Sequence, residues 1–339
     1  MNMSKVKVGV AGLGRIGKVH AEIIFSRLEK AELVAVMDIV GELARTTAEK
    51  YKVKAYTDYD AMLKDPEIDA VYVTTPTNLH KEMIIKAAES GKHIFAEKPI
   101  TVTVSEAVEA VKAAEKAGVK LMVGYMRRFD DAYRTAKKKI SEGAIGNPLV
   151  FINVARDPGP PPGWAQDPRL SGGIFLDMLS HDFDMARFLV SREVKEVYVR
   201  GEAALYEEIK QKGDLDVVTI SFEFEGGGYG LIHGSRKSVF GYDLRTEVMG
   251  TEGTIYIGSQ TDPNLAVGTK QGLTYRGVQW FWSRFYDAYV SEGEAFINSI
   301  LMDEKPPITG IDGLRAVEIA EACWESLREH KPVTVKRRL

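Results

Sequence analysis

The sequence predicts a two-domain protein in which an α/β domain with a doubly wound parallel sheet precedes an α+β domain with a large, open, mostly antiparallel sheet. Its 339 residues exceed the usual size of one domain. Short apolar runs alternate with helical stretches through residues 5–125, which is typical of βαβ units. Beyond this point strands follow one another with few helices between them. We therefore place the domains at 1–125 and 126–339.

The N-terminal domain is predicted from five apolar runs. Their near-continuous Val, Ile and Ala content indicates parallel strands that are covered on both faces. The runs are VKVGVAG, ELVAVMD, DAVYVTT, HIFAEK and KLMVGY. Helices are expected between them, near 15–28, 41–51, 78–90 and 105–117.

The second domain is predicted from a change in the order of helices and strands along the chain. A helix near 131–141 and the strand LVFINVAR precede a Pro-rich loop, DPGPPPGWAQDP, which cannot join a central sheet. A helix near 174–190 follows. Glycine-rich turns then separate strands in a way that indicates antiparallel hairpins. These strands are EVKEVYVRGEAAL, DVVTISFEFEGG, GYGLIHGSRKS, RTEVMG and GTIYIGS, before two last helices near 283–303 and 312–329.

Composition excludes several classes of function. The formal net charge of -3 provides no basic field for nucleic acid and no polybasic patch for a membrane. The sole cysteine, Cys323, allows no intrachain disulfide, which fits a reducing compartment, and we expect it to be a buried, inert thiol. We see neither a secretory signal nor a membrane-spanning apolar run. We expect a soluble, cytoplasmic protein.

A glycine-rich motif follows the first strand. Gly12 permits a tight turn, Gly14 lets the backbone approach a pyrophosphate, and Gly17 allows the next helix to pack closely on the strand. The N-terminus of that helix faces the anion. Because this glycine-rich motif lies at the start of a series of βαβ units, we favour a dinucleotide-binding site. A glycine turn without a ligand and an S-adenosylmethionine site remain alternatives.

Asp38 ends the second predicted strand, where a carboxylate accepts hydrogen bonds from ribose hydroxyls. A carboxylate at this position would repel a 2′-phosphate. The next residues, Ile39, Val40 and Gly41, supply no cation to offset that repulsion. We therefore favour NAD over NADP as the cofactor.

Two further strand ends should lie at the same edge of the sheet. Asn78 follows the run that ends in TTPT, and it either contacts the cofactor or caps the next helix. Lys98 precedes Pro99, which disfavours helical backbone at Lys98, so we expect this lysine to project into the ligand crevice.

Polar residues on the apolar helix near 174–190 indicate a second group of candidate functional residues. Asp177, His181 and Asp184 are spaced at i, i+4 and i+7, so they should share one helix face. Burial of unpaired acids and a histidine is costly, so the stripe indicates a crevice. Helix capping with a satisfied core histidine, and a metal site, are the alternatives; a zinc site would normally draw on Cys or more His. We therefore predict no metal.

With these residues identified, the chain resembles the glucose–fructose oxidoreductase/inositol dehydrogenase/rhizopine-catabolism family along essentially its whole length. The resemblance is carried by VGVAGLGRIGKVHA, TPTNLH, AEKP, GYMRRFD and SGGIFLDMLSHDFDMARFL. It implies a Rossmann domain, then a substrate-binding α+β domain whose sheet face often makes dimers and tetramers. ARDPGPPP, VFGYDLRTEVMGTEG and RFYDAYVSE look like the inositol 2-dehydrogenase branch.

The resemblance implies roles for individual residues. Catalysis falls on Lys98, Asp177 and His181. Substrate binding falls on Lys98, Arg127, Asp184 and Tyr242. Cofactor binding falls on Gly12, Gly14, Arg15, Ile16, Gly17, Asp38, Thr75, Asn78, His80, Glu97 and Lys98.

The implied reaction is NAD-dependent oxidation of a secondary hydroxyl of a cyclic polyol, with myo-inositol as the expected substrate, in a homotetramer. Another sugar as substrate is the main alternative, and a nucleotide-binding regulator without turnover is a second. His181 would be the general base, with Asp177 orienting it and Lys98 stabilising the developing alkoxide. Trp164 in the Pro-rich loop either narrows the substrate pocket or anchors the loop.

Overall fold

The structure is a computed structural model that describes residues 5–258, 261–270, 272–278 and 280–339. The chain forms two compact units, each assembled from segments that are distant in sequence. The first contains the residues up to Met126, then Asp287–Val317 and Arg338–Leu339, and the second contains Arg127–Tyr286 and Glu318–Arg337. The consecutive domains 1–125 and 126–339 stay a prediction.

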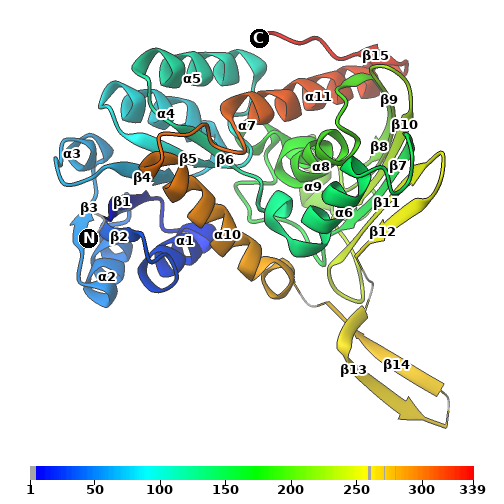
Figure 1. Ribbon diagram of the computed structural model, residues 1–339, viewed down its shortest axis with the longest axis horizontal. Coiled ribbons are helices and arrows are strands. Elements are labelled where there is room, and N and C mark those ends of the chain that lie inside the picture. The colour runs from blue at the N-terminus through cyan, green and yellow to red at the C-terminus, as the bar shows by residue number, and fades with distance from the viewer. Residues whose placement is uncertain (1–4, 259–260, 271, 279) are drawn as a thin grey trace. The chain divides into compact units, whose positions relative to one another are not determined.

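The first unit is built on a six-stranded parallel sheet with the order β3-β2-β1-β4-β5-β6 (Figure 1). Its strands are β1 (Val6–Ala11), β2 (Ala31–Met37), β3 (Lys54–Tyr56), β4 (Ala70–Val73), β5 (His93–Glu97) and β6 (Leu121–Gly124). The predicted doubly wound fold is therefore confirmed. The strand order reverses between β1 and β4, and such switch points are where open α/β sheets bind ligands.

The first unit also contains helices between its strands. They are α1 (Arg15–Ser26), α2 (Gly41–Tyr51), α3 (Tyr59–Leu63), the 3₁₀ helix η1 (Thr77–Leu79), α4 (His80–Glu89) and α5 (Val104–Ala117). Thr103 and Glu106 form a reciprocal capping box at the start of α5, and Gly118 ends that helix at a φ of 67°. The short elements α3 and β3 were not predicted.

Two C-terminal helices, α10 (Phe281–Leu301) and α11 (Gly310–Glu329), also contribute to this unit. An added Cβ at Gly313 would lie 3.0 Å from Ile100, and one at Gly293 would lie 3.0 Å from Leu28. The part of α10 from Asp287 and the part of α11 up to Val317 therefore pack closely within the parallel-sheet unit, although they follow Arg127–Tyr286 in sequence.

The second unit is built on a seven-stranded sheet with the order β12-β11-β7-β10-β9-β8-β15. Its strands are β7 (Pro148–Arg156), β8 (Val194–Glu202), β9 (Val217–Phe224), β10 (Tyr229–Ser235), β11 (Asp243–Gly250), β12 (Thr254–Ile257) and β15 (Val333–Thr334). Neighbours pair antiparallel except β7 and β10, which are parallel, so the predicted mostly antiparallel sheet is confirmed.

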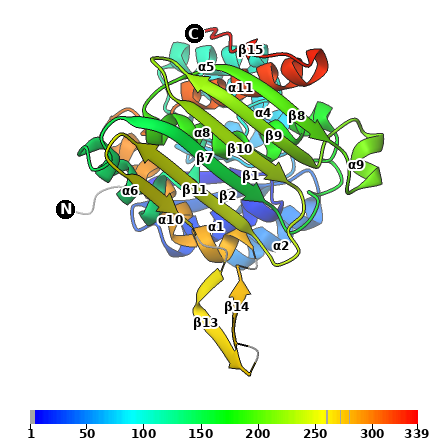
Figure 2. The ribbon, with the colours of Figure 1, turned by 90° about the vertical axis from the view of Figure 1, so that its right-hand side faces the viewer.

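One face of this sheet is covered by helices of the unit, and the other carries none of the helices that the structure describes (Figure 2). The covering helices include α6 (Asp131–Ser141) and α8 (Ser180–Val190). Shorter helical elements include the 3₁₀ helix η2 (Met126–Phe129), α7 (Pro168–Ser171) and α9 (Glu207–Gln211). Burial alternates along β9, as expected when one face of a strand packs on a core.

The single helix predicted near 174–190 is wrong in one respect, because the structure divides it. Ile174–Met178 forms a π-helix, η3, in which the Leu179 amide donates to the Ile174 carbonyl, and α8 begins only at Ser180. Gly172 and Gly173 precede η3 with φ values of 80° and 68°, so the chain enters it through left-handed backbone. α-Helical spacing therefore does not hold across this segment, and π turns of this kind are frequent at functional sites.

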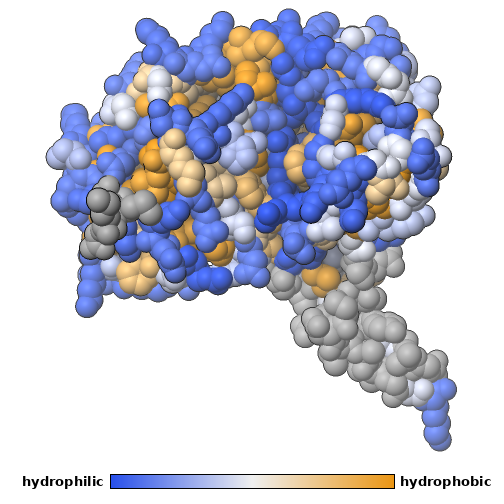
Figure 3. Space-filling model, in the orientation of Figure 1, coloured by the Kyte–Doolittle hydropathy of each residue, from blue (hydrophilic) through white to orange (hydrophobic). Residues whose placement is uncertain are grey.

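A hairpin of β13 (Thr261–Thr269) and β14 (Gly272–Gly277), which the sequence did not predict, extends away from the seven-stranded sheet (Figure 1). Cys323 is buried in α11, as predicted, and burial raises the pKa of its thiol. Most of the surface shown in Figure 3 is hydrophilic with small apolar patches. Within the described residues, no helix has the length and apolar character needed to cross a membrane.

Candidate active site

The glycine-rich turn between β1 and α1 has the geometry of a dinucleotide cradle. Gly12 has a φ of 95°, and an added Cβ there would lie 2.8 Å from the Thr74 backbone. A Cβ at Gly17 would lie 1.8 Å from the Gly12 carbonyl oxygen, so the turn and the helix can meet only through glycine. At Gly14 an added Cβ would meet nothing within 4 Å. Open space beside an exposed backbone at a helix N-terminus fits a pyrophosphate.

Asp38 directly follows β2 and is fixed beside this turn. Its Oδ2 accepts a hydrogen bond of 2.7 Å from the Leu13 amide, and its Oδ1 accepts one of 2.9 Å from the Val40 amide. These two bonds hold the carboxylate in place with part of its surface open. The residues present therefore fit a dinucleotide with a free ribose diol.

The other residues predicted to bind the cofactor differ in exposure. Arg15 and Asn78 are exposed, and Ile16 and Thr75 are half-buried. The Thr75 hydroxyl donates to the Met83 sulfur at 3.1 Å. Asn78 lies inside η1 and is the N-cap of neither η1 nor α4, so capping does not account for it.

His80 and Glu97 are buried beneath this edge. The His80 ring nitrogens lie 2.8 Å from the carbonyl oxygens of Pro99 and Thr75, and burial lowers the pKa of the imidazole against the pull of those carbonyls. Glu97 lies 2.7 Å from Nε2 of buried His20, and it accepts a bond from the backbone amide of half-buried Lys98. Both residues thus support the strand ends that carry Thr75 and Lys98. The peptide bond between Lys98 and Pro99 is cis.

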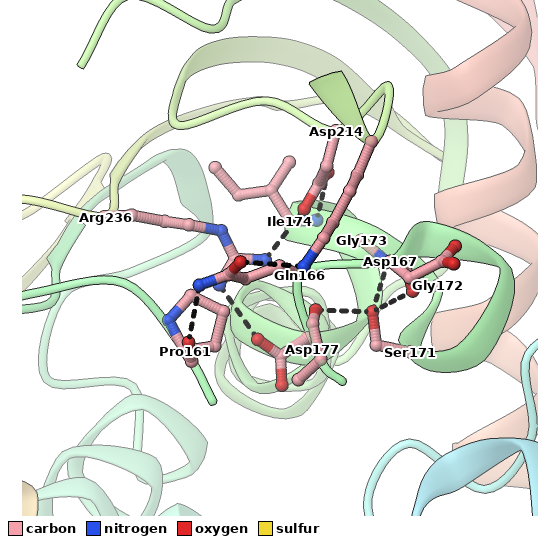
Figure 4. Close-up of polar contacts among 12 residues, drawn as sticks. Pro161, Gln166, Asp167, Ser171, Gly172, Gly173, Ile174, Asp177, Asp214 and Arg236 are labelled. Atoms are coloured by element: carbon pink, nitrogen blue, oxygen red, sulfur yellow. Dashed lines mark hydrogen bonds and ion pairs between the residues drawn. The ribbon is translucent and has the colours of Figure 1, made fainter. Parts of the chain in front are cut away.

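In the second unit, Asp177 lies at the end of a line of alternating charges (Figure 4). Its Oδ2 accepts a 2.9 Å hydrogen bond from Arg236, and the same guanidinium donates to Asp214 at 3.1 Å. The side chains of Arg236 and Asp214 are fully buried, whereas that of Asp177 is 24% exposed. Burial raises the pKa of Asp214, and Arg236 opposes that shift.

His181 and Asp184 both lie on α8. His181 is in the first turn and is only 7% exposed. Asp184 is fully buried and accepts two hydrogen bonds from Arg128, one of them 2.8 Å from Nε. Asp177 lies on the preceding π-helix, so regular α-helical spacing does not relate it to His181 and Asp184, and the one-face stripe stays a prediction.

Arg127 and Tyr242 lie together in a buried polar network. Arg127 donates to Asp182 at 2.6 Å and to the Tyr242 hydroxyl at 3.1 Å. Asp182 also accepts from Asn153 at 2.7 Å. Burial raises the pKa of the Tyr242 hydroxyl. Burial alone would lower the pKa of the Arg127 guanidinium, but the charge of Asp182 holds the pKa of Arg127 above its usual value. The structure brings these two predicted substrate contacts together.

Sequence reasoning missed the partners that hold these side chains. Asp182, Asn153, Asp214 and Arg236 were not predicted, although Asp182 lies one residue after the predicted base, His181. Trp164 is 40% exposed in a loop where Lys212 donates to the Gly163 carbonyl and to Gln166, both at 2.9 Å. Among the side chains the structure describes, no cluster of three or more His, Cys, Asp or Glu could hold a metal ion.

Two family models match consecutive parts of the chain. The oxidoreductase family with an NAD-binding Rossmann fold matches residues 6–125, and the GFO/IDH/MocA C-terminal domain matches residues 133–256. The chain belongs to the Gfo/Idh/MocA oxidoreductase family. This confirms the resemblance seen in the sequence, and full-length relatives of this family support it further.

The chain is 38% identical to a myo-inositol 2-dehydrogenase of Thermotoga maritima over 98% of this chain and 99% of that protein. It is 38% identical to a scyllo-inositol 2-dehydrogenase (NAD(+)) of Bacillus subtilis over 97% and 96% of the two chains. A solved scyllo-inositol dehydrogenase from Lactobacillus casei, with bound NAD(H) and scyllo-inositol, has a TM-score of 0.91 at 32% identity and covers 98% of this chain and 99% of that one.

Proposed function

We propose that this protein is an NAD-dependent inositol 2-dehydrogenase that oxidises a secondary hydroxyl of myo-inositol to the 2-keto inositol. The observation that carries the proposal is similarity along nearly the whole chain to proteins named inositol dehydrogenases. From the resemblance of the motifs around them, we assign catalysis to Lys98, Asp177 and His181. A regulator that holds NAD without turnover would not need all three.

The proposed cofactor is NAD, which supplies the hydride acceptor when it is bound. Gly12, Gly14 and Gly17 would hold its pyrophosphate, and Asp38 would accept hydrogen bonds from the adenosine ribose. The Leu13 and Val40 amides support this assignment because they keep the Asp38 carboxylate beside the turn. Ile39 is 81% exposed and supplies no positive charge for a 2′-phosphate. The same features favour NAD over NADP.

We assign the proton transfer to His181. Neutral imidazole accepts the proton of the reacting hydroxyl, and such general base catalysis contributes about 10²–10⁴-fold. Asp177 orients the ring and stabilises the imidazolium that forms. Lys98 donates a hydrogen bond to the reacting oxygen and favours the developing alkoxide.

Arg127 and Tyr242 are the substrate contacts that we retain from the sequence. Their network supports this role, because Asp182 and Asn153 hold the Arg127 guanidinium in one geometry beside the Tyr242 hydroxyl. Asp184 stays a prediction as a substrate contact; its buried carboxylate is paired with Arg128.

The test is a panel of polyols with purified protein. The reduced-nicotinamide absorbance is followed with myo-inositol, scyllo-inositol, glucose and a methyl glucoside, each with NAD and NADP. We expect the highest kcat/KM with myo-inositol and NAD, and loss of nearly all turnover in His181→Ala with NAD affinity retained. Turnover of a pyranose without any inositol would overturn the choice of substrate, and full activity of His181→Ala would overturn the assignment of the base.

We further propose a cytoplasmic homotetramer. The uncovered face of the second unit's sheet supports association, because it exposes apolar side chains including Leu231 and Tyr229, and exposed apolar faces usually mark interfaces. A single buried cysteine supports a reducing compartment. Light scattering that showed a monomer at micromolar concentration would overturn the assembly, and fractionation of the source cells tests the location.

A further inference from the structure

Asp177 is held by a fully buried arginine that comes from a distant part of the same unit. Arg236 follows β10, 59 residues along the chain from Asp177, and its backbone amide donates to the Asp216 carbonyl at 2.8 Å. Its guanidinium bridges Asp177 and Asp214. The line therefore runs from the interior at Asp214, through Arg236, to the partly exposed carboxylate of Asp177 (Figure 4).

Asp214 also fixes the backbone from which Asp177 projects. Its Oδ1 accepts a 2.9 Å hydrogen bond from the amide of Ile174, the first residue of η3. An added Cβ at Gly173 would lie 2.5 Å from that same Oδ1 and 2.8 Å from the Trp324 ring. One carboxylate thus sets both the start of the π-helix and, through Arg236, the rotamer of the aspartate on it.

The energetics of this line do not favour a role in stability alone. Removing charges from water is costly, and replacing a buried ion pair by apolar residues of similar volume is often neutral or stabilising. A guanidinium, by contrast, donates in a rigid planar fork, so it orients two carboxylates at once in a way that lysine does not. Orientation of Asp177 is therefore what this arrangement supplies.

We propose that Arg236, backed by Asp214, is a positioning residue for the dehydrogenase reaction, which sets the orientation of the Asp177 carboxylate toward the general base. The proposal rests on the proposed function, in which Asp177 acts on His181. Arg236 is fully buried, and its assigned role runs only through Asp177.

The test is a double-mutant cycle between Arg236→Gln and Asp177→Asn. Loss of an outer partner that orients an active-site ligand typically costs about 10- to 100-fold in activity at metal sites, and we expect a fall of that order in kcat for Arg236→Gln. The dissociation constant of NAD should stay within twofold. In the Asp177→Asn background, Arg236→Gln should change kcat less than twofold, because the two residues act as one unit. Arg236→Lys keeps the positive charge but lacks the planar fork, so its kcat should lie between those of the wild type and Arg236→Gln.

Arg187→Gln is the matched control. Arg187 is also a nearly buried arginine of this unit, paired through Nε with Glu193 at 2.7 Å in the last turn of α8. Both variants should lower the unfolding temperature, but only Arg236→Gln should lower kcat. Equal retention of kcat in the two variants, or losses in the cycle that multiply, would overturn the positioning role.

A crystal structure of Arg236→Gln supplies a readout independent of turnover, and Asp214→Asn covers the case in which Arg236→Gln does not fold. We expect the Asp177 side chain to leave its single orientation in either variant. An unchanged Asp177 conformer would overturn the proposal whatever the activity. Absence of polyol turnover in the wild-type protein, with Asp177 displaced in the variant, would instead overturn the proposed function.

Discussion

The glycine-rich turn offers the sharpest test of cofactor binding, because an added methyl group would enter open space at Gly14 but meet backbone at Gly17. At Gly14 a methyl group would enter open space, in a backbone with φ -63° and ψ -166° that alanine also adopts. Alanine is a poorer N-cap than glycine, but it also reduces the entropy of the unfolded chain by a comparable amount. We therefore expect Gly14→Ala to change the free energy of unfolding of the apo protein by less than about 0.5 kcal/mol.

The same methyl group would occupy the space where a pyrophosphate approaches the backbone. We expect the dissociation constant of NAD to rise at least tenfold, which corresponds to about 1.4 kcal/mol. At a concentration one hundred times the wild-type dissociation constant, the stabilisation of the wild type by NAD is about 2.7 kcal/mol. A tenfold weaker Gly14→Ala should gain only about 1.4 kcal/mol under the same conditions.

Gly17→Ala is the matched comparison. Its added Cβ would lie 1.8 Å from the Gly12 carbonyl oxygen, a backbone atom that cannot move aside without opening the turn. Overpacking of this kind costs about 1–3 kcal/mol or more, so the apo protein itself should lose stability. Chemical unfolding without NAD and fluorescence titration with NADH separate the two effects. Unchanged affinity in Gly14→Ala, or an apo destabilisation equal to that of Gly17→Ala, would refute this reasoning.

Three further predictions concern other parts of the chain. Asp38→Ser combined with Ile39→Arg should raise kcat/KM for NADP relative to NAD, because repulsion of a 2′-phosphate is replaced by attraction; an unchanged ratio would count against Asp38 as the ribose partner. Hydrogen bonds from Lys54, and then from neighbouring groups, lower the pKa of Asp65 to about 2, below the value of about 3.9 for an unfolded chain. Asp65→Asn should therefore lower the free energy of unfolding by about 1 kcal/mol at neutral pH. In urea unfolding, this difference from the wild type should fade as the pH falls from about 4 to 2. Leu231→Arg should dissociate the proposed assembly through the uncovered sheet face, and light scattering that shows an unchanged mass would exclude that face as an interface.

Structural features that depend only on residues close together in the sequence could be predicted from the sequence itself. The turn from Gly12 to Gly17 requires particular backbone angles and close approach, and only glycine meets those requirements. The proposed ribose-binding role of Asp38 was predicted from its position directly after a strand of a βαβ unit. Apolar runs predicted the parallel sheet because strands buried on both faces need them, and the alternation after residue 125 predicted the second sheet.

Tertiary structure decided which distant side chains meet. Arg236 contacts Asp177 across 59 residues, and Arg127 contacts Asp182 across 55, separations at which no periodic pattern carries information. Regular α-helical spacing also fails at η3, a π turn whose first amide donates to Asp214, 40 residues further along the chain. The sequence thus determined the backbone turns and the identity of the candidate reactive groups. Only packing decided that Asp184 is buried in an ion pair while Asp177 stays partly exposed, because burial depends on what the rest of the chain places around each carboxylate.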